Sequence, residues 1–158
     1  MKLAQDVTFN TTLASLGSYA SAIGWMRDGK AKTQTKGYVQ DLRIKTPSVN
    51  QMVKLLSGGN QQKVVIARWL LRDCDVLIFD EPTRGIDVGA KEENYKLLQQ
   101  LASEGKSIIV ISSELPEILR VANRIIVMAN GRVTGVLRNE DASQEKIMKF
   151  ATYGEDEE

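Results

Sequence analysis

Two patterns of apolar positions organise the chain. Uninterrupted apolar runs at Val76–Phe79 and Ile108–Ile111 predict buried strands, because a strand that is covered on both faces needs no polar alternation. Apolar-rich runs on either side of Asn130 and Gly131, within residues 124–137, predict a β-hairpin with a two-residue turn. Strands that alternate with helices and end in a hairpin give an α/β chain with a parallel sheet.

In the first half of the chain, apolar residues that recur at spacings of three and four predict helices. One face of an N-terminal helix is formed by Phe9, Leu13, Leu16, Ala20 and Ile23. The polar and basic stretch 24–36 is expected to hold a loop and a helix start, with Gly29 and Gly37 as breaks. A short amphipathic helix is expected over residues 49–56.

Four further helices are predicted from residue 63 onward, and one of them is a short helix that carries Ile118 and Leu119. Residues 63–72 read as a buried helix whose apolar bulk comes from Val65, Ile66, Trp69 and Leu70. Asp87 is able to cap the next helix, which Gly105 would end. Residues 143–150 have the pattern of a last helix.

The composition is that of one soluble globular domain. With 158 residues the chain can bury a sizeable core, and 42% apolar with 26% charged residues is ordinary for such a domain. A net charge of +1 creates no field for nucleic acid, and no apolar run approaches the ~18 residues of a membrane span. The single cysteine, Cys74, predicts no intrachain disulfide. There is no histidine, so the commonest catalytic base and metal ligand is absent.

Residues 57–59 combine a hydroxyl with two glycines in front of an apolar helix. Ser57 suits the N-cap position, while Gly58 and Gly59 let backbone N–H groups approach a ligand without interference from a Cβ atom. Free N–H groups at the positive end of a helix dipole bind anions. Taken alone, such a triplet is more often the start of an ordinary capped helix.

Asp80 and Glu81 are adjacent carboxylates that follow the apolar run Val76–Phe79. A buried strand would deliver both to its C-terminal edge, where ligands of open α/β sheets bind. Two like charges are costly to bury together, so the pair is expected to divide two different tasks. A bare match of this kind is more often a surface pair at a strand end. Combined with an anion-binding helix start, it suggests nucleotide chemistry.

Three segments, in this order and spacing, resemble motifs of ATP-binding cassette (ABC) ATPases. Leu56–Gln62 is similar to the signature motif, Val76–Glu81 to the Walker B strand, and Glu81–Asp87 to the segment that leads into the D-loop. The particular residues that this chain has in these segments are similar to those in the second cassette of bacterial sugar importers of the ribose/galactose/xylose type. The resemblance covers residues 7–153, which correspond to only the C-terminal part of such a cassette.

The resemblance implies a partial P-loop NTPase core of the ABC ATPase type, with a parallel sheet, a C-terminal hairpin and an N-terminal helical subdomain. Residues 1–72 would form the helical subdomain, ending in the signature motif and its helix. Residues 73–158 would form the C-terminal half of the RecA-like ATPase core, with the Walker B strand, the D-loop, the switch position, the hairpin and the last helix.

The resemblance also assigns roles to individual residues. Asp80 would hold Mg²⁺ through water, and Glu81 would be the base that polarises the attacking water. Asp87 would lie at the seam between two opposed cassettes. The residues that would contact the γ-phosphate of ATP held by the opposing cassette are Ser57, Gly58, Gly59, Asn60 and Gln61. Asn60 stands where the family most often has the longer glutamine.

Two departures from the family pattern bear on activity. The family has a histidine after the strand predicted at residues 108–111, and here Ser113 occupies that position. A hydroxyl can donate a hydrogen bond but cannot become cationic, so transition-state stabilisation is expected to be weaker. The phosphate-binding sequence Gly-x-x-x-x-Gly-Lys-Ser/Thr occurs nowhere in the 158 residues. The family hydrolyses ATP, but this chain alone is not expected to bind or hydrolyse it.

The resemblance implies part of an importer subunit that couples ATP hydrolysis to sugar uptake. Its partners would be an opposing cassette and membrane-spanning permease subunits, with a sugar-binding protein involved indirectly and no nucleic acid. The subunit would lie peripherally at the cytoplasmic face of the inner membrane.

Two other interpretations are open. A non-catalytic module that donates a signature motif or regulates a transporter would not need Asp80 and Glu81, and their presence argues against it. An ABC ATPase of chromosome maintenance or DNA repair would carry long coiled coils beside the signature, and no sustained heptads occur here.

In the family the Walker A strand lies beside the strand predicted at residues 108–111. Without a Walker A segment, that strand is expected to have an open edge. We therefore expect either a rearranged sheet, in which the hairpin of residues 124–137 fills the gap, or a chain that associates with itself.

Overall fold

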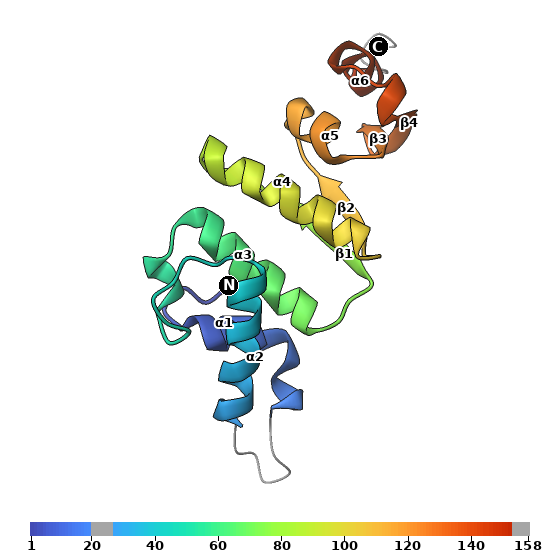
Figure 1. Cartoon of the computed structure of the whole chain (residues 1–158). Helices are drawn as coiled ribbons and strands as arrows, with labels where there is room; N and C mark the ends of the chain where they lie inside the picture. Colours follow the sequence, from blue (N-terminus) through green and yellow to red (C-terminus); the bar gives the residue numbers. More distant parts are fainter. Residues whose placement is uncertain (20–26, 153–158) are drawn as a thin grey trace. The chain divides into compact units, whose positions relative to one another are not determined.

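The computed structural model describes residues 1–19 and 27–152, which fall into two compact units (Figure 1). The helical unit comprises Met1–Leu77 and Thr83–Ser107, and the hairpin unit comprises Ile78–Pro82 and Ile108–Glu158. The units therefore alternate along the chain. The subdomain boundary predicted at residues 72 and 73 stays a prediction.

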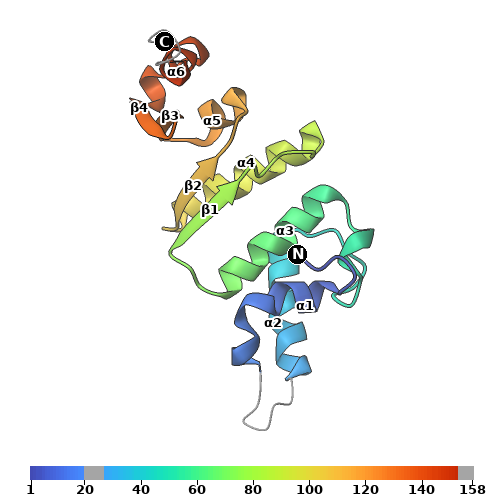
Figure 2. The same ribbon diagram turned by 180° about the vertical axis from the view of Figure 1, so that it is seen from behind.

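The helical unit is built around α3 (Gly58–Leu71), and α1 (Val7–Thr12) packs against it. Figures 1 and 2 show α1 beside α3 from opposite sides. α2 (Asp28–Asp41) contacts both of these helices, and α4 (Val88–Ser103) contacts α3. Fully buried apolar residues of this unit include Val7, Val53, Val64 and Ala67.

A buried arginine joins α3 to α1. The guanidinium of Arg68 donates from Nε to the carbonyl of Asn10 at 2.7 Å and from Nη2 to Asn10 Oδ1 at 3.3 Å. Burial lowers the pKa of Arg68. The next residue, Trp69, is 45% exposed, so the prediction that it adds apolar bulk to a buried face is wrong. Ile66 is buried as predicted, and Val64, Ala67 and Arg68 complete the buried face of α3.

The predicted N-terminal helix is shorter than its apolar spacing indicates. α1 ends at Thr12, and the 3₁₀ segment η1 (Leu13–Ser18) follows, with Ser15 at a non-helical φ of −128°. The Thr12 hydroxyl donates to the carbonyl of Thr8 at 2.9 Å, and this competition with backbone bonding weakens a short helix. Two members of the predicted face, Ala20 and Ile23, lie outside the described residues.

Two further helix predictions in this region are wrong. α2 runs through both Gly29 and Gly37 without a break, because one glycine costs a helix only about 1 kcal/mol and the neighbouring residues favour it. The amphipathic helix expected over residues 49–56 is reduced to the single 3₁₀ turn η2 (Val53–Leu55). Here the backbone instead bonds to the segment before α1, with Val53 N–H donating to the carbonyl of Gln5 at 3.0 Å.

The first sheet pairs β1 (Val76–Asp80) with β2 (Ser107–Ile111), as the apolar runs predict. Hydrogen bonds at the two ends show that the strands are parallel: Ser107 N–H donates to the carbonyl of Asp75 at 2.9 Å, and Glu81 N–H donates to the carbonyl of Ile111 at 2.8 Å. α4 connects the two strands, with Asp87 as its N-cap and Gly105 after its end at a φ of +94°. The positions of the strands and of the helix between them are confirmed, but the prediction that both strands are buried is wrong. Ile78 of β1 is 64% exposed and Ile111 of β2 is 52% exposed, because the side chains alternate between a covered and an open face.

The second sheet is the predicted hairpin of β3 (Arg124–Ala129) and β4 (Arg132–Arg138). Asn130 and Gly131 both have positive φ, +49° and +74°, as a tight two-residue turn requires. The register is irregular after Val127, which lies opposite Gly135.

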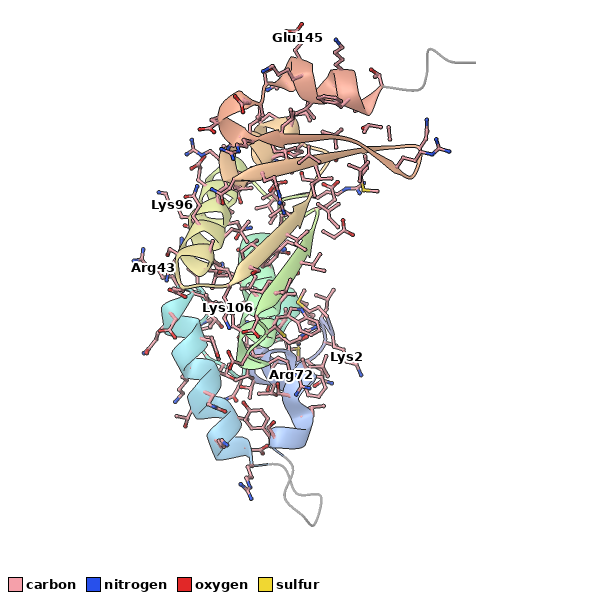
Figure 3. The ribbon with its side chains drawn as sticks, turned by 90° about the vertical axis from the view of Figure 1, so that its right-hand side faces the viewer. Lys2, Arg43, Arg72, Lys96, Lys106 and Glu145 are labelled. Carbon is pink, nitrogen blue, oxygen red and sulfur yellow. The ribbon has the colours of Figure 1, made fainter. Side chains whose placement is uncertain are left out.

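Two helices and a short 3₁₀ turn complete the hairpin unit. α5 (Leu115–Val121) precedes the hairpin, and η3 (Asn139–Asp141) and α6 (Gln144–Ala151) follow it. Buried residues Ile125, Val127 and Ile147 form the core between the hairpin and α6. Glu145, in the first turn of α6, is exposed and projects from the ribbon (Figure 3).

Within residues 1–19 and 27–152, β2 pairs with no strand other than β1. The hairpin pairs only with itself, so the rearrangement in which it fills the gap beside β2 is not found, while self-association stays a prediction. None of the helices described is both long and apolar enough to cross a bilayer.

Candidate functional site

The predicted anion-binding helix start lies at the beginning of α3. Ser57 is the N-cap residue, but its hydroxyl makes no capping bond to the backbone. Instead, Ser57 Oγ accepts a hydrogen bond from Asn60 Nδ2 at 2.8 Å, and Asn60 Oδ1 accepts the backbone N–H of Lys45 at 2.7 Å. Gln61 Nε2 donates to the carbonyl of Leu56 at 3.0 Å. The amide side chains thus hold the loop around the helix start, and no side chain caps the first turn.

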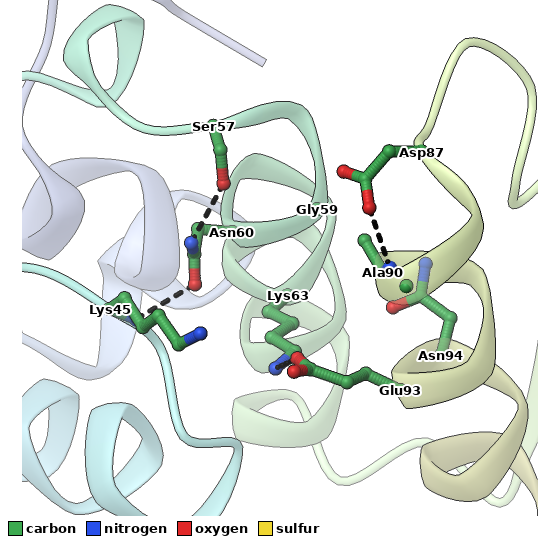
Figure 4. A pocket seen from close by; sticks show the side chains of 10 residues that line it. Lys45, Ser57, Gly59, Asn60, Lys63, Asp87, Ala90, Glu93 and Asn94 are labelled. Atoms are coloured by element: carbon green, nitrogen blue, oxygen red, sulfur yellow. Dashed lines mark hydrogen bonds and ion pairs between the residues drawn. The ribbon is translucent and has the colours of Figure 1, made fainter.

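The helix start borders a groove of about 310 Å³ between α3 and the N-terminal part of α4 (Figure 4). Gly59 and Ala90 bring the two helices closest together, since a Cβ atom at Gly59 would lie 3.0 Å from Ala90 Cβ. On the other wall, Asp87 caps α4 by accepting the N–H of Ala90 on Oδ1 at 2.9 Å. The structure therefore brings Asp87 into the same groove as Ser57, Gly59 and Asn60. Its place at a seam between two cassettes stays a prediction.

An ion pair crosses the base of this groove. The Lys63 ammonium lies 2.8 Å from Glu93 Oε2, and the side chains of Lys63 and Glu93 are 7% and 52% exposed. The hydrogen bond and the charge of Lys63 lower the pKa of Glu93. Asn94, which is 2% exposed, also lines the groove, and both polar atoms of its amide are without a hydrogen-bond partner.

In the hairpin unit, the two predicted carboxylates follow each other at the end of β1. Asp80 is the last residue of the strand and is exposed. Glu81 has a φ of +47°, a left-handed conformation that costs a non-glycine residue about 1 kcal/mol or more. Its backbone N–H donates to the carbonyl of Ile111 at the end of β2. The structure thus places Asp80 and Glu81 together at the C-terminal edge of the parallel pair, as predicted.

Ser113 contacts Glu81 through the backbone. Its N–H donates to Glu81 Oε1 at 3.0 Å, a contact that any residue other than proline would make in this conformation. The residue type predicts a contact through the hydroxyl, which would take the place of the histidine side chain. The observed link does not depend on that hydroxyl.

Reasoning from the sequence also misses Lys63, Glu93 and Glu117. Glu117 is 1% exposed and accepts the hydroxyl of Ser112 on Oε2, while its Oε1 has no hydrogen-bond partner. Lys63 and Glu93 pair with each other although they are far apart in the sequence, and Glu117 faces the interior although it is an acid. No local sequence pattern indicates such contacts. Within the part of the chain that the structure describes, no group of three or more histidine, cysteine, aspartate or glutamate residues is arranged to hold a metal.

Comparison with known proteins identifies the family. The fold described above is that of the ATP-binding cassettes of ABC transporters, and a model of the ABC transporter family matches residues 2–84. That match spans more than half of the chain and includes the signature and Walker B segments. The chain belongs to the ABC transporter family.

Curated relatives are sugar-import proteins by name. A Burkholderia lata protein provisionally named ribose/galactose/methyl galactoside import ATP-binding protein 1 is 58% identical over 156 residues. The galactose/methyl galactoside import ATP-binding protein of Vibrio vulnificus is 48% identical over 147 residues. These matches cover 98% and 93% of this chain but only 30% and 29% of the relatives. The chain therefore spans less than a third of their length.

Solved structures agree on the fold. A dimeric ATP-binding cassette in a post-hydrolysis state, bound to ADP and Pi, matches 88% of this chain with a TM-score of 0.72 at 24% identity. A nucleotide-free cassette from an ABC transporter matches 96% of this chain with a TM-score of 0.73 at 19% identity. The chain covers 59% and 61% of those two cassettes. The fold is that of a partial P-loop NTPase core of the ABC type.

Proposed function

We propose that this chain is the C-terminal part of an ATP-binding subunit of a carbohydrate importer, in which ATP hydrolysis drives sugar uptake. The observation that carries the proposal is the placement of Glu81. Glu81 directly follows β1, and its backbone conformation is strained. Hydrogen bonds to the carbonyl of Ile111 and from the N–H of Ser113 hold it beside the end of β2. The sugar importer class is supported by the names of relatives that are up to 58% identical.

Glu81 acts as the general base of the proposed reaction. Its carboxylate takes a proton from water as the water oxygen attacks the γ-phosphorus of ATP. The bond from that phosphorus to the β–γ bridging oxygen breaks, so that ADP leaves and phosphate is formed. The N–H of Ser113 fixes Oε1, so rotation of the carboxylate is restricted and Oε2 has a defined direction. This orientation matters because a base contributes fully only when it is held within hydrogen-bond reach of the proton that it abstracts.

Asp80 is the residue suited to Mg²⁺. Its carboxylate is exposed at the end of β1, and Mg²⁺ retains water and takes few protein ligands. Asp80 would hold it through water. When bound, the ion would neutralise charge on the phosphate oxygens.

The start of α3 serves a second nucleotide, bound by an opposing cassette. Its first turn has no side-chain cap, and the positive end of the helix dipole lies there, so backbone N–H groups are available to a γ-phosphate. The residues in contact with that phosphate would be Ser57, Gly58, Gly59, Asn60 and Gln61. Asp87, across the groove, lies at the seam between the two cassettes.

The assembly that follows from this function contains an opposing cassette and membrane-spanning permease subunits. A sugar-binding protein acts on it indirectly, and nucleic acid has no part in it. The subunit lies peripherally at the cytoplasmic face of the membrane.

A chimera tests the proposal. This chain replaces the matching segment of the Burkholderia lata relative, and ATP hydrolysis is measured with and without Glu81→Gln. Because glutamine keeps size and hydrogen bonding but removes the base, we expect kcat to fall by about 10² or more while ATP still binds. Glu145→Gln, an exposed carboxylate on α6, is the matched control and leaves turnover unchanged.

An unchanged rate in Glu81→Gln would place the chemistry elsewhere. A chimera that binds ATP without hydrolysing it, while the unaltered relative is active, would support the alternative of a non-catalytic module that donates its signature motif.

A further inference from the structure

Glu117 is a buried acid that the proposed reaction does not use. It is 1% exposed, and Oε1 has no hydrogen-bond partner. Burying a carboxyl group with one unsatisfied oxygen costs stability, and an apolar residue of similar size would cost less. Its neighbours on α5, Leu115, Ile118 and Leu119, pack against the core of the hairpin unit. A carboxyl group at this place therefore calls for an explanation other than packing.

The explanation lies in the turn between β2 and α5. Ser112 Oγ donates its proton to Glu117 Oε2 and also accepts the backbone N–H of Glu114 at 3.1 Å. Ser112 Oγ is thus bonded on both sides, and its position is set by Glu117. Residues 112–114 are closed into a turn in which Ser113 is the middle residue.

Ser113 is the residue whose N–H reaches Glu81. That bond is 3.0 Å long, and Glu81 also receives support from the carbonyl of Ile111, directly before the turn. One continuous segment, from Ile111 to Glu117, therefore holds Glu81 in its left-handed conformation. The direction of the Ser113 N–H depends on how the turn is closed.

We propose that Glu117 is a positioning residue for Glu81, acting through the Ser112 hydroxyl and the turn that presents the Ser113 N–H. The proposal rests on the proposed function for its catalytic meaning, because Glu81 is the base only if the subunit hydrolyses ATP. The positioning itself is a property of this chain and can be measured without nucleotide.

The first test uses the chain itself, labelled with ¹⁵N. The Ser113 amide is followed by its ¹H chemical shift and its hydrogen-exchange rate, and Glu81→Ala supplies the reference without an acceptor. Glu117→Met keeps bulk but removes both oxygens, and we expect the Ser113 shift to move to the Glu81→Ala value, with exchange about tenfold faster. Glu117→Gln keeps an acceptor for Ser112 and should restore the wild-type values.

A second pair of variants removes the link at Ser112. Ser112→Ala should reproduce Glu117→Met, while Ser112→Thr, which retains the hydroxyl, should match wild type. The amides of the β3–β4 hairpin report whether the unit is folded. If Glu117→Met is unfolded by this criterion, Ser112→Ala decides. Wild-type behaviour of the Ser113 amide in Ser112→Ala would overturn the proposal, as would a Ser113 amide that is insensitive to Glu81→Ala.

Kinetics in the chimera separate the two proposals. If both are right, Ser112→Ala and Glu117→Met lower kcat with little change in the KM for ATP, and Ser112→Thr and Glu117→Gln restore it. If Glu81→Gln leaves turnover unchanged while the Ser113 amide still responds to Glu117→Met, the proposed function fails and the positioning stands. If Glu81→Gln abolishes turnover but neither Glu117→Met nor Ser112→Ala affects the amide, the positioning fails alone.

Discussion

The ammonium of Lys63 on α3 lies 2.8 Å from Glu93 Oε2 on α4. An ion pair therefore joins the two helices that border the groove lined by Ser57, Gly59 and Asn60. Lys63 is buried and Glu93 is half exposed. The pair lowers the pKa of Glu93, and a group with a depressed pKa stabilises the folded state only while it is ionised.

The first prediction follows from the lowered pKa of Glu93. The stabilisation from Glu93 is present above its ordinary pKa and is lost as the pH falls through the lowered value. Glu93→Gln should therefore reduce the free energy of unfolding at pH 7, by less than about 1 kcal/mol because Glu93 is largely exposed. Urea unfolding of both proteins at pH 7 and in acid measures the difference. A difference that persists or grows in acid would contradict the prediction.

The second prediction concerns the contact between Gly59 and Ala90. Gly59→Ala would put a Cβ atom 3.0 Å from Ala90 Cβ, closer than packed methyl groups normally lie. We expect a loss of about 1 kcal/mol or more in the free energy of unfolding, because α3 and α4 must separate slightly. Gly58→Ala is the matched control, since a Cβ atom there meets nothing within 4 Å.

Relief of the overlap provides a further check on the same contact. The double variant Gly59→Ala with Ala90→Gly removes the second methyl group and should recover part of the loss. Equal effects of Gly58→Ala and Gly59→Ala would show that helix propensity, and not the contact between helices, determines the outcome.

Much of the fold can be predicted from local signals. The runs that form β1 and β2, the cap at Asp87 and the turn at Asn130 and Gly131 all depend on residues adjacent in sequence, and all are confirmed. The N-terminal helix is predicted too long because apolar spacing does not register the competing hydroxyl bonds of threonine. Local patterns therefore predict elements better than their boundaries.

The residues of the candidate site also divide into those that local patterns predict and those that they do not. The place of Asp80 and Glu81 at the end of β1 can be predicted from the sequence, because it follows directly from the apolar run before them, while their roles stay proposals. Glu117 is not found, because its role depends on Ser112 being turned back towards α5 in the folded chain. For Ser113, the residue type suggests a hydroxyl contact, whereas the structure shows a backbone one, which no sequence pattern reveals.

The third prediction is that the chain alone has no ATP site. No Gly-x-x-x-x-Gly-Lys-Ser/Thr sequence is present in it to surround the phosphates with N–H groups and a lysine. Isothermal titration of the chain with Mg-ATP should show no saturable heat at micromolar concentrations, whereas the chimera binds. Micromolar binding at one site by the chain alone would contradict this prediction.

The fourth prediction is self-association through the first sheet. β2 pairs only with β1 among the described residues, and Ile109 and Ile111 of β2 are exposed. Unpaired edges with apolar side chains recruit other strands. Light scattering should show mass that increases with concentration, and hydrogen exchange at Val110, whose N–H points away from β1 in this register, should slow in parallel. A monomer at all concentrations, with Val110 fully protected, would refute the prediction.

The alternation of the two units along the chain has a mechanical consequence for the carboxylates. The segment Ile78–Pro82, which carries Asp80 and Glu81, belongs to the hairpin unit but is joined at both ends to the helical unit. Two covalent tethers, one at each end, therefore connect this short segment to the unit that bears the signature helix. A single proteolytic cut therefore does not separate the two units. A chain that ends at Leu77 lacks α4, and with it Glu93, the partner of Lys63.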